Sequence, residues 1–599
     1  MSGICGFCDF GHSGGTLERR EEAHRMGETL NHRGPEDRGL WQGNRCVLVH
    51  RRPRGQSRQP LVRRVDGADC VLVFDGALYD LPDLRRALAG EGWTFDTQGE
   101  AEALLAALIL WGERAAERLD GAFAFAFWDG RRERLICGRD RLGVRPFFYT
   151  WQEGTFVFAS EPKALFQYPG LEPRLGRDGL REVLGLCPVR TPGMGIFEGV
   201  MELPPATQLV LGREEVRRAP YWQLVSRPHR EDYPETVERV RELLQRSVTL
   251  RLESEEPLCA FLSGGLDSSF VTALAARAYT ECGRKPLDTL SLRYAGGRET
   301  ERSSFRPDDQ GYYVQWMAEV FHTRQRTVTC DTPALANLLE DGAAARDLPG
   351  MGAADSALLY LSRQAARSHK RALAGVGADP LFGGWSWCDR EEPGHGFPWE
   401  PDLEARRAVF NKGLWTDLRV EDYVRERRRQ TLAACPKLEE ERGFETRRRE
   451  LGWLALTCCL PAQLEQWDRM TMASGLEVRL PFCDHRLVEY VWNIPWAMKG
   501  MNGQRKQVLR DAALGLLPEG VRTRPKTPYP QGADPLYDQL VRARVARILE
   551  APNAPIHSLA DRAALDGLLM DQGRGPAATR TLTYLIQLNA WMERFHLTV

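Results

Sequence analysis

The sequence predicts an α/β multidomain protein, with an N-terminal α+β layered domain, a parallel α/β domain and a mostly helical C-terminal part. At 599 residues the chain is too long for one hydrophobic core, so at least two domains are expected. Short apolar runs separated by glycine-rich turns favour strands up to about residue 210. A strand, a glycine turn and a helix follow one another near residue 260, which indicates a parallel sheet, and helical patterns dominate from about residue 400.

Composition and charge are those of an ordinary globular protein. Hydrophobic residues make up 43% of the sequence, charged residues 27%, and the formal net charge is -1. This balance gives no overall field that would attract nucleic acid or a membrane surface, and no apolar stretch approaches the ~20 residues of a membrane helix. The N-terminus has no signal-peptide pattern, so we expect a cytoplasmic protein that binds neither nucleic acid nor a membrane. Arginine clusters such as 447–449 are expected to lie on solvent-exposed helix faces.

The N-terminal elements predict a domain over residues 1–215. Two apolar runs, 70–74 and 122–128, are bounded by Asp-Gly and glycine-rich turns, as is typical of strands. Helical patterns interrupt the strands near 83–90 and 101–118. The alternation of strands and helices favours an α+β layered arrangement.

A second domain is predicted over residues 232–599, after a polar linker at 225–233. Residues 237–252 have the apolar spacing of an amphipathic helix. The apolar run 258–262 predicts a buried strand, and residues 268–279 predict the helix that follows its glycine turn. This order is that of a parallel α/β sheet.

The strongest chemical signal is the turn 263–269 between that strand and that helix. Its two glycines allow a tight turn and a close approach to a ligand, and its N–H groups, its hydroxyls and the start of the helix predict an anion site. A phosphate there would bring a magnesium ion, for which Asp267 is a natural ligand. The alternative is a plain glycine turn with a serine helix cap. The predicted nucleotide-binding residues of this segment are Leu262, Ser263, Gly264, Gly265, Asp267, Ser268 and Ser269.

This loop is not a Walker loop, because no lysine follows its second glycine, and it resembles the pyrophosphate loop of the ATP-pyrophosphatase superfamily. Nearly the whole chain resembles glutamine-dependent asparagine synthetases. The resemblance is carried in the C-terminal half by the segments 375–384, 468–486, 503–510 and 524–526. It implies an ATP-pyrophosphatase (adenine nucleotide α-hydrolase-like) domain that uses ATP and Mg²⁺ and activates a carboxylate as an acyl-adenylate.

The resemblance also implies roles for individual residues. Asp267 and Asp379 would share Mg²⁺, while Gly375 and Gly377 would contact the nucleotide. Lys506 and Lys526 would neutralise the pyrophosphate leaving group. A surface charge is the alternative for both lysines; the phosphate role is favoured for Lys526, and the two alternatives are equally favoured for Lys506.

The N-terminal half resembles the family's glutaminase domain, an Ntn-hydrolase-like α+β sandwich. The matching segments are 2–4, 32–37, 74–76, 123–125, 139–143 and 159–165.

Several positions depart from the family. Ser2 stands where the family needs a nucleophilic Cys, Asp75 stands beside Gly76 in place of the oxyanion-hole Asn, and Glu100 replaces the Asp that holds the glutamine amino group. A carboxylate repels a developing oxyanion. Although Arg51, which would pair with the glutamine carboxylate, is present, we expect an inactive glutaminase domain.

The synthetase half departs from the family as well. Position 376 is Val where the family has a Glu that binds or acts as a base, Ala374 replaces a Ser, and Ala353 stands where relatives carry a further Asp. Such a pocket would hold an α-ammonium group poorly, so free aspartate is not the expected acyl substrate.

Three hypotheses follow. The first hypothesis is a tailoring amide ligase that joins a small-molecule or peptide carboxylate to an amine or ammonia. It rests on the combination of an intact phosphate site with an altered glutaminase site, which resembles β-lactam synthetases and lasso-peptide cyclases. The alternatives are an asparagine synthetase that uses aspartate, and a non-catalytic pseudosynthetase. Homodimers are common in such relatives.

Overall fold

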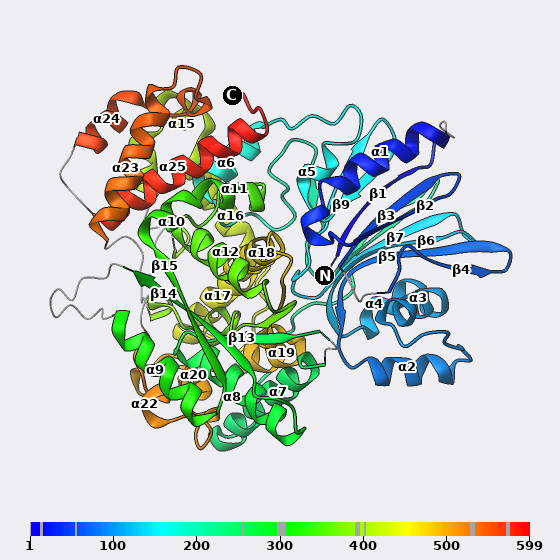
Figure 1. Ribbon diagram of the computed structural model, residues 1–599, viewed down its shortest axis with the longest axis horizontal. Coiled ribbons are helices and arrows are strands. Elements are labelled where there is room, and N and C mark those ends of the chain that lie inside the picture. The colour runs from blue at the N-terminus through cyan, green and yellow to red at the C-terminus, as the bar shows by residue number, and fades with distance from the viewer. Residues whose placement is uncertain are drawn as a thin grey trace. The chain divides into compact units, whose positions relative to one another are not determined.

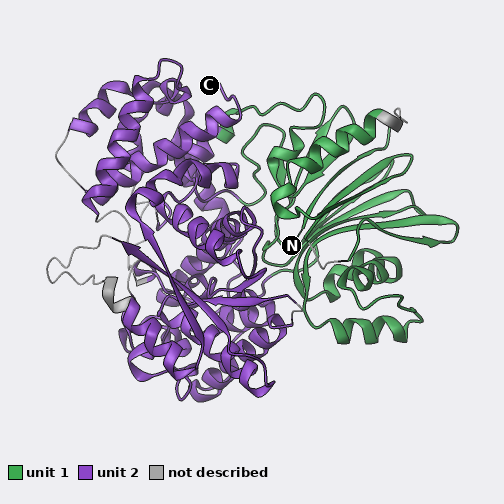
Figure 2. Ribbon diagram, in the orientation of Figure 1, with its two compact units in different colours: residues 1–179, 192–223 green, residues 180–191, 224–599 purple. Residues whose placement is uncertain are grey.

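The computed structural model describes residues 2–11, 16–53, 57–253, 256–295, 307–389, 396–399, 403–526, 534–570 and 575–598. The chain divides into two compact units (Figure 2). Unit 1 comprises residues 1–179 and 192–223, and unit 2 comprises residues 180–191 and 224–599. The predicted first domain was one continuous run, whereas residues 180–191 group with unit 2 in the structure.

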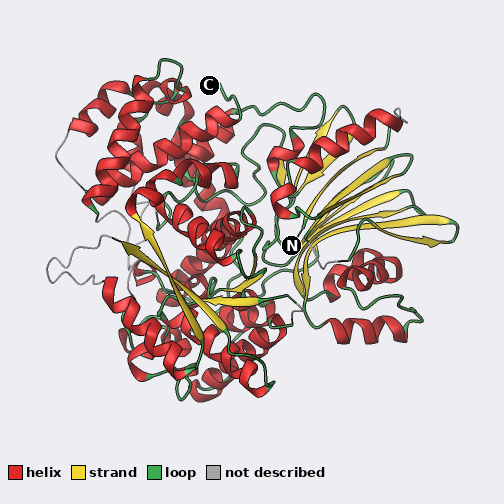
Figure 3. Cartoon of the chain, in the orientation of Figure 1, coloured by secondary structure: helices red, strands yellow, loops and turns green. Residues whose placement is uncertain are grey.

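Unit 1 is a four-layer structure in which two antiparallel sheets lie between helices (Figure 3). Helices α1 (Thr16–Glu28) and α5 (Pro162–Leu165) cover the first sheet, and α3 (Glu100–Trp111) covers the second, with α2 (Leu81–Gly90) packed on α3. The first sheet has the strand order β10 (Met201–Glu202), β8 (Phe148–Gln152), β9 (Thr155–Ala159), β1 (Gly3–Asp9), β3 (Cys46–Arg52), β2 (Asp37–Gln42). The second has the order β12 (Val216–Pro220), β11 (Thr207–Leu211), β7 (Arg134–Arg139), β6 (Gly121–Asp129), β5 (Ala68–Leu78), β4 (Leu61–Val65).

Burial on both faces explains why the central strands are continuous apolar runs. Along β5, Leu72 and Phe74 pack in the core beneath the helices, and Val71 and Val73 pack in the core between the two sheets. Successive side chains of a strand point to opposite faces, so both sets must be apolar when both faces are covered. The predicted strands 70–74 and 122–128 are therefore confirmed within β5 and β6.

The helix predicted at 101–118 is divided in two. After α3, Gly112 adopts a φ of 58°, which a residue with a side chain rarely takes, and a shorter helix, α4 (Ala115–Arg118), follows. The glycine thus ends the first helix, and the continuous prediction was wrong at this point.

Unit 2 is built on a five-stranded parallel sheet, as predicted (Figure 1). Its strand order is β15 (Arg324–Asp331), β14 (Asp288–Ala295), β13 (Leu258–Phe261), β16 (Arg371–Leu373), β17 (Glu477–Arg479). The central strand β13 leads through residues 262–265 into helix α8 (Leu266–Glu281). The sheet therefore presents the carboxyl end of its middle strand, the position where ligands bind in open α/β sheets.

Helix α7 (Tyr233–Arg251) begins four residues before its predicted start. The Asp232 side chain accepts a hydrogen bond from the Glu235 backbone at 2.9 Å, and the Glu235 side chain accepts one from the Asp232 backbone at 3.1 Å. This reciprocal capping box fixes the start of the helix ahead of the apolar pattern.

The C-terminal part is mostly helical, as predicted, and β17 is its contribution to the sheet. Helices α11 (Leu339–Arg346), α23 (Pro535–Glu550) and α25 (Pro576–Arg594) pack against one another. Among the residues that the structure describes, none of the helices is both long enough and apolar enough to cross a membrane.

Candidate functional site

The phosphate loop predicted at 263–269 is held in shape by its own serines. The Ser268 hydroxyl accepts a hydrogen bond from the Ser263 backbone at 3.1 Å, and the two hydroxyls lie 2.9 Å apart. Gly264 has a φ of 70°, so the turn requires a residue without a side chain. Its carbonyl accepts a hydrogen bond of 3.0 Å from Arg524, which sequence reasoning had placed in a motif but not in the site.

Not every predicted loop residue faces outward. Leu262 is 1% exposed and its backbone N–H donates to Leu290 in the neighbouring strand. Ser269 is fully buried inside α8, and its hydroxyl has no hydrogen-bond partner within the described part of the chain. Ser263 and Gly265 are the more exposed members of the loop.

Four charged residues predicted from distant parts of the chain meet beside this loop. Asp267 lies in the first turn of α8, and Asp379 lies in the short helix α13 (Ala378–Phe382). The Lys506 ammonium is 2.8 and 2.7 Å from the two carboxylate oxygens of Asp267 and 2.5 Å from Oδ1 of Asp379. Lys526 completes the cluster at 2.7 Å from the same Asp379 oxygen.

The surface-charge alternative is wrong for Lys506, whose side chain is only 7% exposed, while that of Lys526 is 35% exposed. Lys506 also has a φ of 60°, a left-handed conformation that costs on the order of 1 kcal/mol for a residue with a side chain. The surrounding structure therefore holds this lysine in a strained backbone conformation with its ammonium between two carboxylates.

The two carboxylates differ in their electrostatics because Asp379 has two ammonium groups at ion-pair distance and Asp267 has one. Burial would raise the pKa of Asp379, but Lys506 and Lys526 together outweigh it and lower that pKa to about 2. Burial raises the pKa of Asp267 above its usual range, since Lys506 offsets the effect only in part and Asp379 adds repulsion. For Lys506, burial alone would lower the pKa, yet the two carboxylates raise it above the usual value. The cluster thus pairs two carboxylate side chains with two lysine side chains.

Glycines allow the backbone to approach this cluster closely. A Cβ atom on Gly384 would lie 1.9 Å from Oδ1 of Asp379 and 2.3 Å from Cε of Lys506. A Cβ atom on Gly375 would lie 2.8 Å from the Ser268 backbone nitrogen, and Gly377 has a φ of 101°. No side chain fits at Gly384 or Gly375 without displacing the charged groups or the phosphate loop, and the φ of Gly377 would strain any residue with a side chain.

The donor set suits a magnesium ion shared with phosphate. Asp267 and Asp379 offer carboxylate oxygens, the ligands that Mg²⁺ prefers, and a phosphate would supply the remaining oxygens. Oδ1 of Asp379 is buried and has two ammonium groups at ion-pair distance, but it receives no hydrogen bond of good geometry in the described structure. It is therefore an oxygen that a metal could take over.

The loop that precedes α12 (Ala353–Ala365) is held from inside the unit. The Gln587 side-chain oxygen accepts hydrogen bonds of 3.1 Å from the backbones of both Gly350 and Gly352. Asp355, fully buried, accepts 2.7 Å from the Met351 backbone and 2.8 Å from Gln466. Gln587 and Gln466 were missed by sequence reasoning, because each lies more than 100 residues from the loop and no local pattern marks it.

These bonds bear on which substrates the loop could recognise. Both Asp355 oxygens are already occupied by groups of the protein, and Ala353 contributes only a methyl group. Val376 stands in the loop between Gly375 and Gly377. The one carboxylate of residues 350–356, that of Asp355, is therefore already bonded to groups of the protein.

In unit 1, predicted glutaminase positions lie around a buried ion-pair network. Ser2 donates from its backbone N–H to Asp75 at 3.0 Å and from its hydroxyl to the Phe74 carbonyl at 3.1 Å. Arg33 lies 3.0 Å from Asp75 and 2.9 Å from Glu161, and its side chain is fully buried. Arg33 and Glu161 were in the quoted motifs but were not predicted as site residues.

The other predicted glutaminase positions lie on neighbouring elements. Arg51 is paired in register with Gly3, and its side chain contacts Glu28 and Asn31. Gly76 has a φ of 146°, and a Cβ atom there would lie 2.0 Å from the Ala122 carbonyl oxygen. Glu100 accepts a hydrogen bond of 3.3 Å from the Leu78 backbone.

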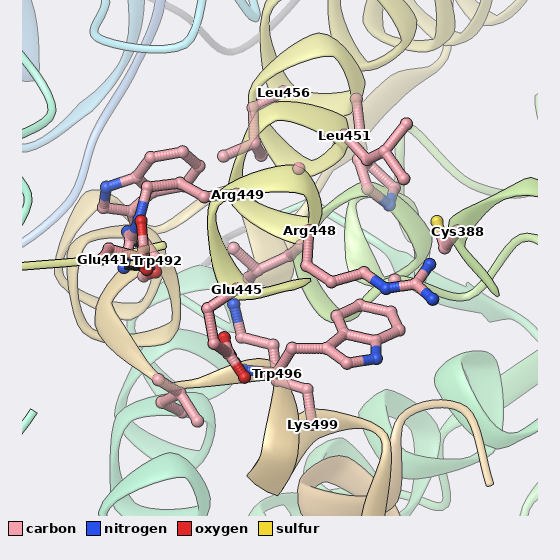
Figure 4. Close-up of a pocket in the computed structure, with 16 residues that line it drawn as sticks. Cys388, Glu441, Glu445, Arg448, Arg449, Leu451, Leu456, Trp492, Trp496 and Lys499 are labelled. Atoms are coloured by element: carbon pink, nitrogen blue, oxygen red, sulfur yellow. Dashed lines mark hydrogen bonds and ion pairs between the residues drawn. The ribbon is translucent and has the colours of Figure 1, made fainter. Parts of the chain in front are cut away.

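A small cavity of about 40 Å³ lies behind α13 in unit 2 (Figure 4). Pro380 within α13, Gly383 directly after it and Lys499 contribute to its wall. Burial lowers the pKa of Lys499 to about 7. Arg447 is exposed as predicted, whereas Arg448 and Arg449 line the cavity, so the predicted exposure was wrong for these two arginines. Arg448 packs over Trp496 and Arg449 over Trp492, which covers their charged groups with aromatic rings.

Comparison with known proteins agrees with this architecture. The asparagine synthase family model matches residues 239–593, and the glutamine amidotransferase domain model matches residues 1–222. The chain is 37% identical to asparagine synthetase [glutamine-hydrolyzing] 3 of Bacillus subtilis, over 100% of both chains. It is 25% identical to asparagine synthetase [glutamine-hydrolyzing] 1 of the same organism, over 86% of this chain and 84% of that protein. It is also 25% identical to amidase chry2 of Gibberella zeae, over 88% of each. The chain therefore belongs to the asparagine synthase family of ATP-dependent carbon–nitrogen ligases.

Proposed function

We propose that the chain activates the carboxylate of a small molecule or peptide, other than free aspartate, as an acyl-adenylate and joins it to an amine or ammonia. The observation that carries this proposal is the meeting of Asp267, Asp379, Lys506 and Lys526 beside the phosphate loop. Nothing structural demands two aspartates and two lysines at the carboxyl end of a parallel sheet, whereas cleavage of ATP between its α and β phosphates does need such charges.

In this mechanism the triphosphate of ATP lies on residues 263–269, with Asp267 and Asp379 holding Mg²⁺. The bound ion supplies positive charge to the phosphate oxygens. A substrate carboxylate oxygen attacks the α-phosphorus and pyrophosphate leaves. The amine then attacks the acyl carbon, the amide bond forms, and AMP leaves.

The lysines would change partners when the nucleotide binds. In the structure their ammonium groups neutralise the two aspartates. A magnesium ion on those carboxylates would free Lys506 and Lys526 to neutralise pyrophosphate as it forms. The same four side chains would thus be charge-balanced before and after ATP binds.

The experiment that tests this function is a pyrophosphate-release assay over a panel of carboxylates with ammonia and simple amines. Wild-type protein should release pyrophosphate and AMP in proportion to a carboxylate substrate. Asp267→Asn should lower that rate by about 100-fold or more while the protein remains folded, because it removes one of two metal-binding carboxylates. Near-normal release by this variant would contradict the assignment.

A second candidate is asparagine synthesis from aspartate, which the names of the Bacillus subtilis relatives favour. The absence of an available carboxylate in the loop at 350–356 opposes it, since Asp355 is occupied by Met351 and Gln466. AMP formation that depends on aspartate and exceeds that with every other carboxylate would establish this candidate instead.

We also propose that unit 1 does not hydrolyse glutamine. What supports this proposal is that Asp75, at the position of an oxyanion donor, is itself an anion paired with Arg33 and bonded to Ser2. Ammonia should therefore support amide formation and glutamine should not, and Ser2→Ala should leave the ammonia-dependent rate unchanged. Glutamine-dependent activity that Ser2→Ala abolishes would overturn this proposal.

A further inference from the structure

Aromatic side chains line the segment that follows the Asp379 helix. Trp385 and Trp387 stack with their ring centroids 5.0 Å apart, Trp387 and Trp399 lie 5.8 Å apart, and Phe397 stacks on Trp399 at 4.9 Å. We call these four residues the aromatic wall. Trp387 and Phe397 are buried, whereas Trp385 and Trp399 are only half-buried.

One end of the aromatic wall lies at the charged cluster. Trp385 directly follows Gly384, whose backbone touches Asp379 and Lys506. The Lys526 ammonium lies over the Trp385 ring, 5.8 Å from its centroid. The Trp385 indole therefore borders the groups proposed to hold ATP.

The other end lies at the loop that precedes α12. Phe397 belongs to a buried cluster with Leu186, Leu454 and Cys458, and both Trp399 and Met351 pack against that cluster. Met351 is part of the loop held by Gln587 and Asp355. The aromatic wall therefore connects the charged cluster with the loop where the acyl substrate is expected to bind.

Small apolar residues lie in the segment that leads into the Asp379 helix. Ala374 is 1% exposed and Val376 stands next to the glycines of the nucleotide loop. The indole nitrogen of Trp399 is buried and has no hydrogen-bond partner in the part of the chain that the structure describes. The apolar groups favour an apolar substrate group, and the Trp399 N–H is a donor that an acceptor atom of the substrate would satisfy.

We propose that the acyl substrate is a carboxylate that carries an aromatic group, and that this group packs on the exposed part of Trp385. This inference rests on the proposed function and names the substrate class of the same site. Trp385 acts as a specificity-determining residue, because it contacts the substrate beside the reacting carboxylate. Aromatic pairs gain more than their buried area alone, which suits recognition of a ring.

The test is a pyrophosphate-release assay with phenylacetate, 3-phenylpropanoate, hexanoate and L-aspartate, each with ammonia. The wild-type kcat/KM should be at least about 10-fold higher for an aromatic acid than for hexanoate or L-aspartate. Trp385→Ala should lower the kcat/KM for the aromatic acid by about 10- to 30-fold, mainly through KM, and Trp385→Phe should keep most of it. Trp385→Leu keeps apolar volume without a flat ring and should fall between them.

Trp453→Phe is the matched control. Trp453 packs against Trp492 at 5.9 Å and donates to the Thr431 carbonyl, outside the aromatic wall. This variant should keep the wild-type order of substrates. Melting temperatures with and without Mg-ATP show whether each variant folds and binds nucleotide.

Two failures can be told apart. If hexanoate is the best substrate, or if Trp385→Ala keeps the wild-type ratio of kcat/KM for the aromatic acid to that for hexanoate, the aromatic inference is wrong while the amide-ligase function stands. If L-aspartate is the best substrate, the aromatic inference is wrong and asparagine synthesis replaces the proposed function. If no carboxylate supports pyrophosphate release although Mg-ATP raises the melting temperature, the proposed function itself is wrong.

Discussion

Replacing Lys506 with methionine tests whether its buried ammonium holds the two aspartates together. Methionine keeps an apolar stem of similar length but removes two contacts with Asp267 and one with Asp379. The side chains of Asp267 and Asp379 are 23% and 21% exposed, so solvent screens part of their mutual repulsion. Breaking a buried pair costs about 3–5 kcal/mol, and this partial exposure reduces the expected loss to about 2–3 kcal/mol. The corresponding fall in Tm for a domain of this size is roughly 2–4 °C.

The assay is thermal unfolding in EDTA and again in millimolar MgCl₂. Lys437→Met serves as the control, because Lys437 pairs with Glu450 at a more exposed site, where the two side chains are 44% and 28% exposed. Loss of this ion pair should change the free energy of unfolding by less than about 0.5 kcal/mol. Magnesium should recover part of the Tm lost by Lys506→Met, since a divalent cation can neutralise the same carboxylates. A fall no larger than that of Lys437→Met would refute the bridging role of Lys506. An equal magnesium effect in wild type and Lys506→Met would refute the shared cation site.

Three further predictions concern other buried groups. Asp75→Asn should lower the Tm of the protein, because it leaves the fully buried Arg33 with one carboxylate fewer, at a cost of about 2–3 kcal/mol, and thermal unfolding checks this. Gln587→Leu should raise the KM for the carboxylate substrate about 10-fold, because two backbone donors of the loop at 350–352 lose their acceptor. The KM for ATP should change little, and steady-state kinetics measure the two constants separately. Lys499→Met should remove a pH dependence of stability. Between the Lys499 pKa of about 7 in the folded chain and its usual value of 10.5, the unfolded chain holds a proton that the folded chain lacks. The free energy of unfolding of the wild type should therefore rise relative to that of the variant by up to about 1.4 kcal/mol per pH unit, which Tm measurements from pH 7 to 9 check. A constant difference over that range would contradict the burial of a neutral amine beside Arg449, Glu445, Glu441 and Cys388.

The local part of the site followed directly from the sequence. The order of strand, glycine turn and helix around Asp267 is encoded within about 25 neighbouring residues, and the structure reproduces it in β13 and α8. Helix ends were less well predicted where a cap decides them. The Asp232–Glu235 capping box starts α7 ahead of its apolar pattern, and Gly112 divides a helix that hydrophobicity alone would continue.

Long-range pairing could not be read from the sequence. Lys506 and Asp267 are 239 residues apart, and the sequence favoured a surface position for this lysine as much as a phosphate role. Gln587 meets Gly350 across 237 residues, and Arg33 meets Glu161 across 128. Each contact depends on how helices and strands pack, and a charged or polar residue viewed alone is most often exposed.

The central claim is that a substrate carboxylate attacks the α-phosphorus of ATP at the cluster formed by Asp267, Asp379, Lys506 and Lys526. The most direct measurement uses a substrate labelled with ¹⁸O in its carboxylate, followed by mass spectrometry of the nucleotide and phosphate products after one turnover with ammonia. One ¹⁸O atom is expected in AMP and none in pyrophosphate, because the attacking oxygen stays on the α-phosphorus when the amide forms. Label in inorganic phosphate together with ADP, or no label in AMP during amide formation, would contradict it.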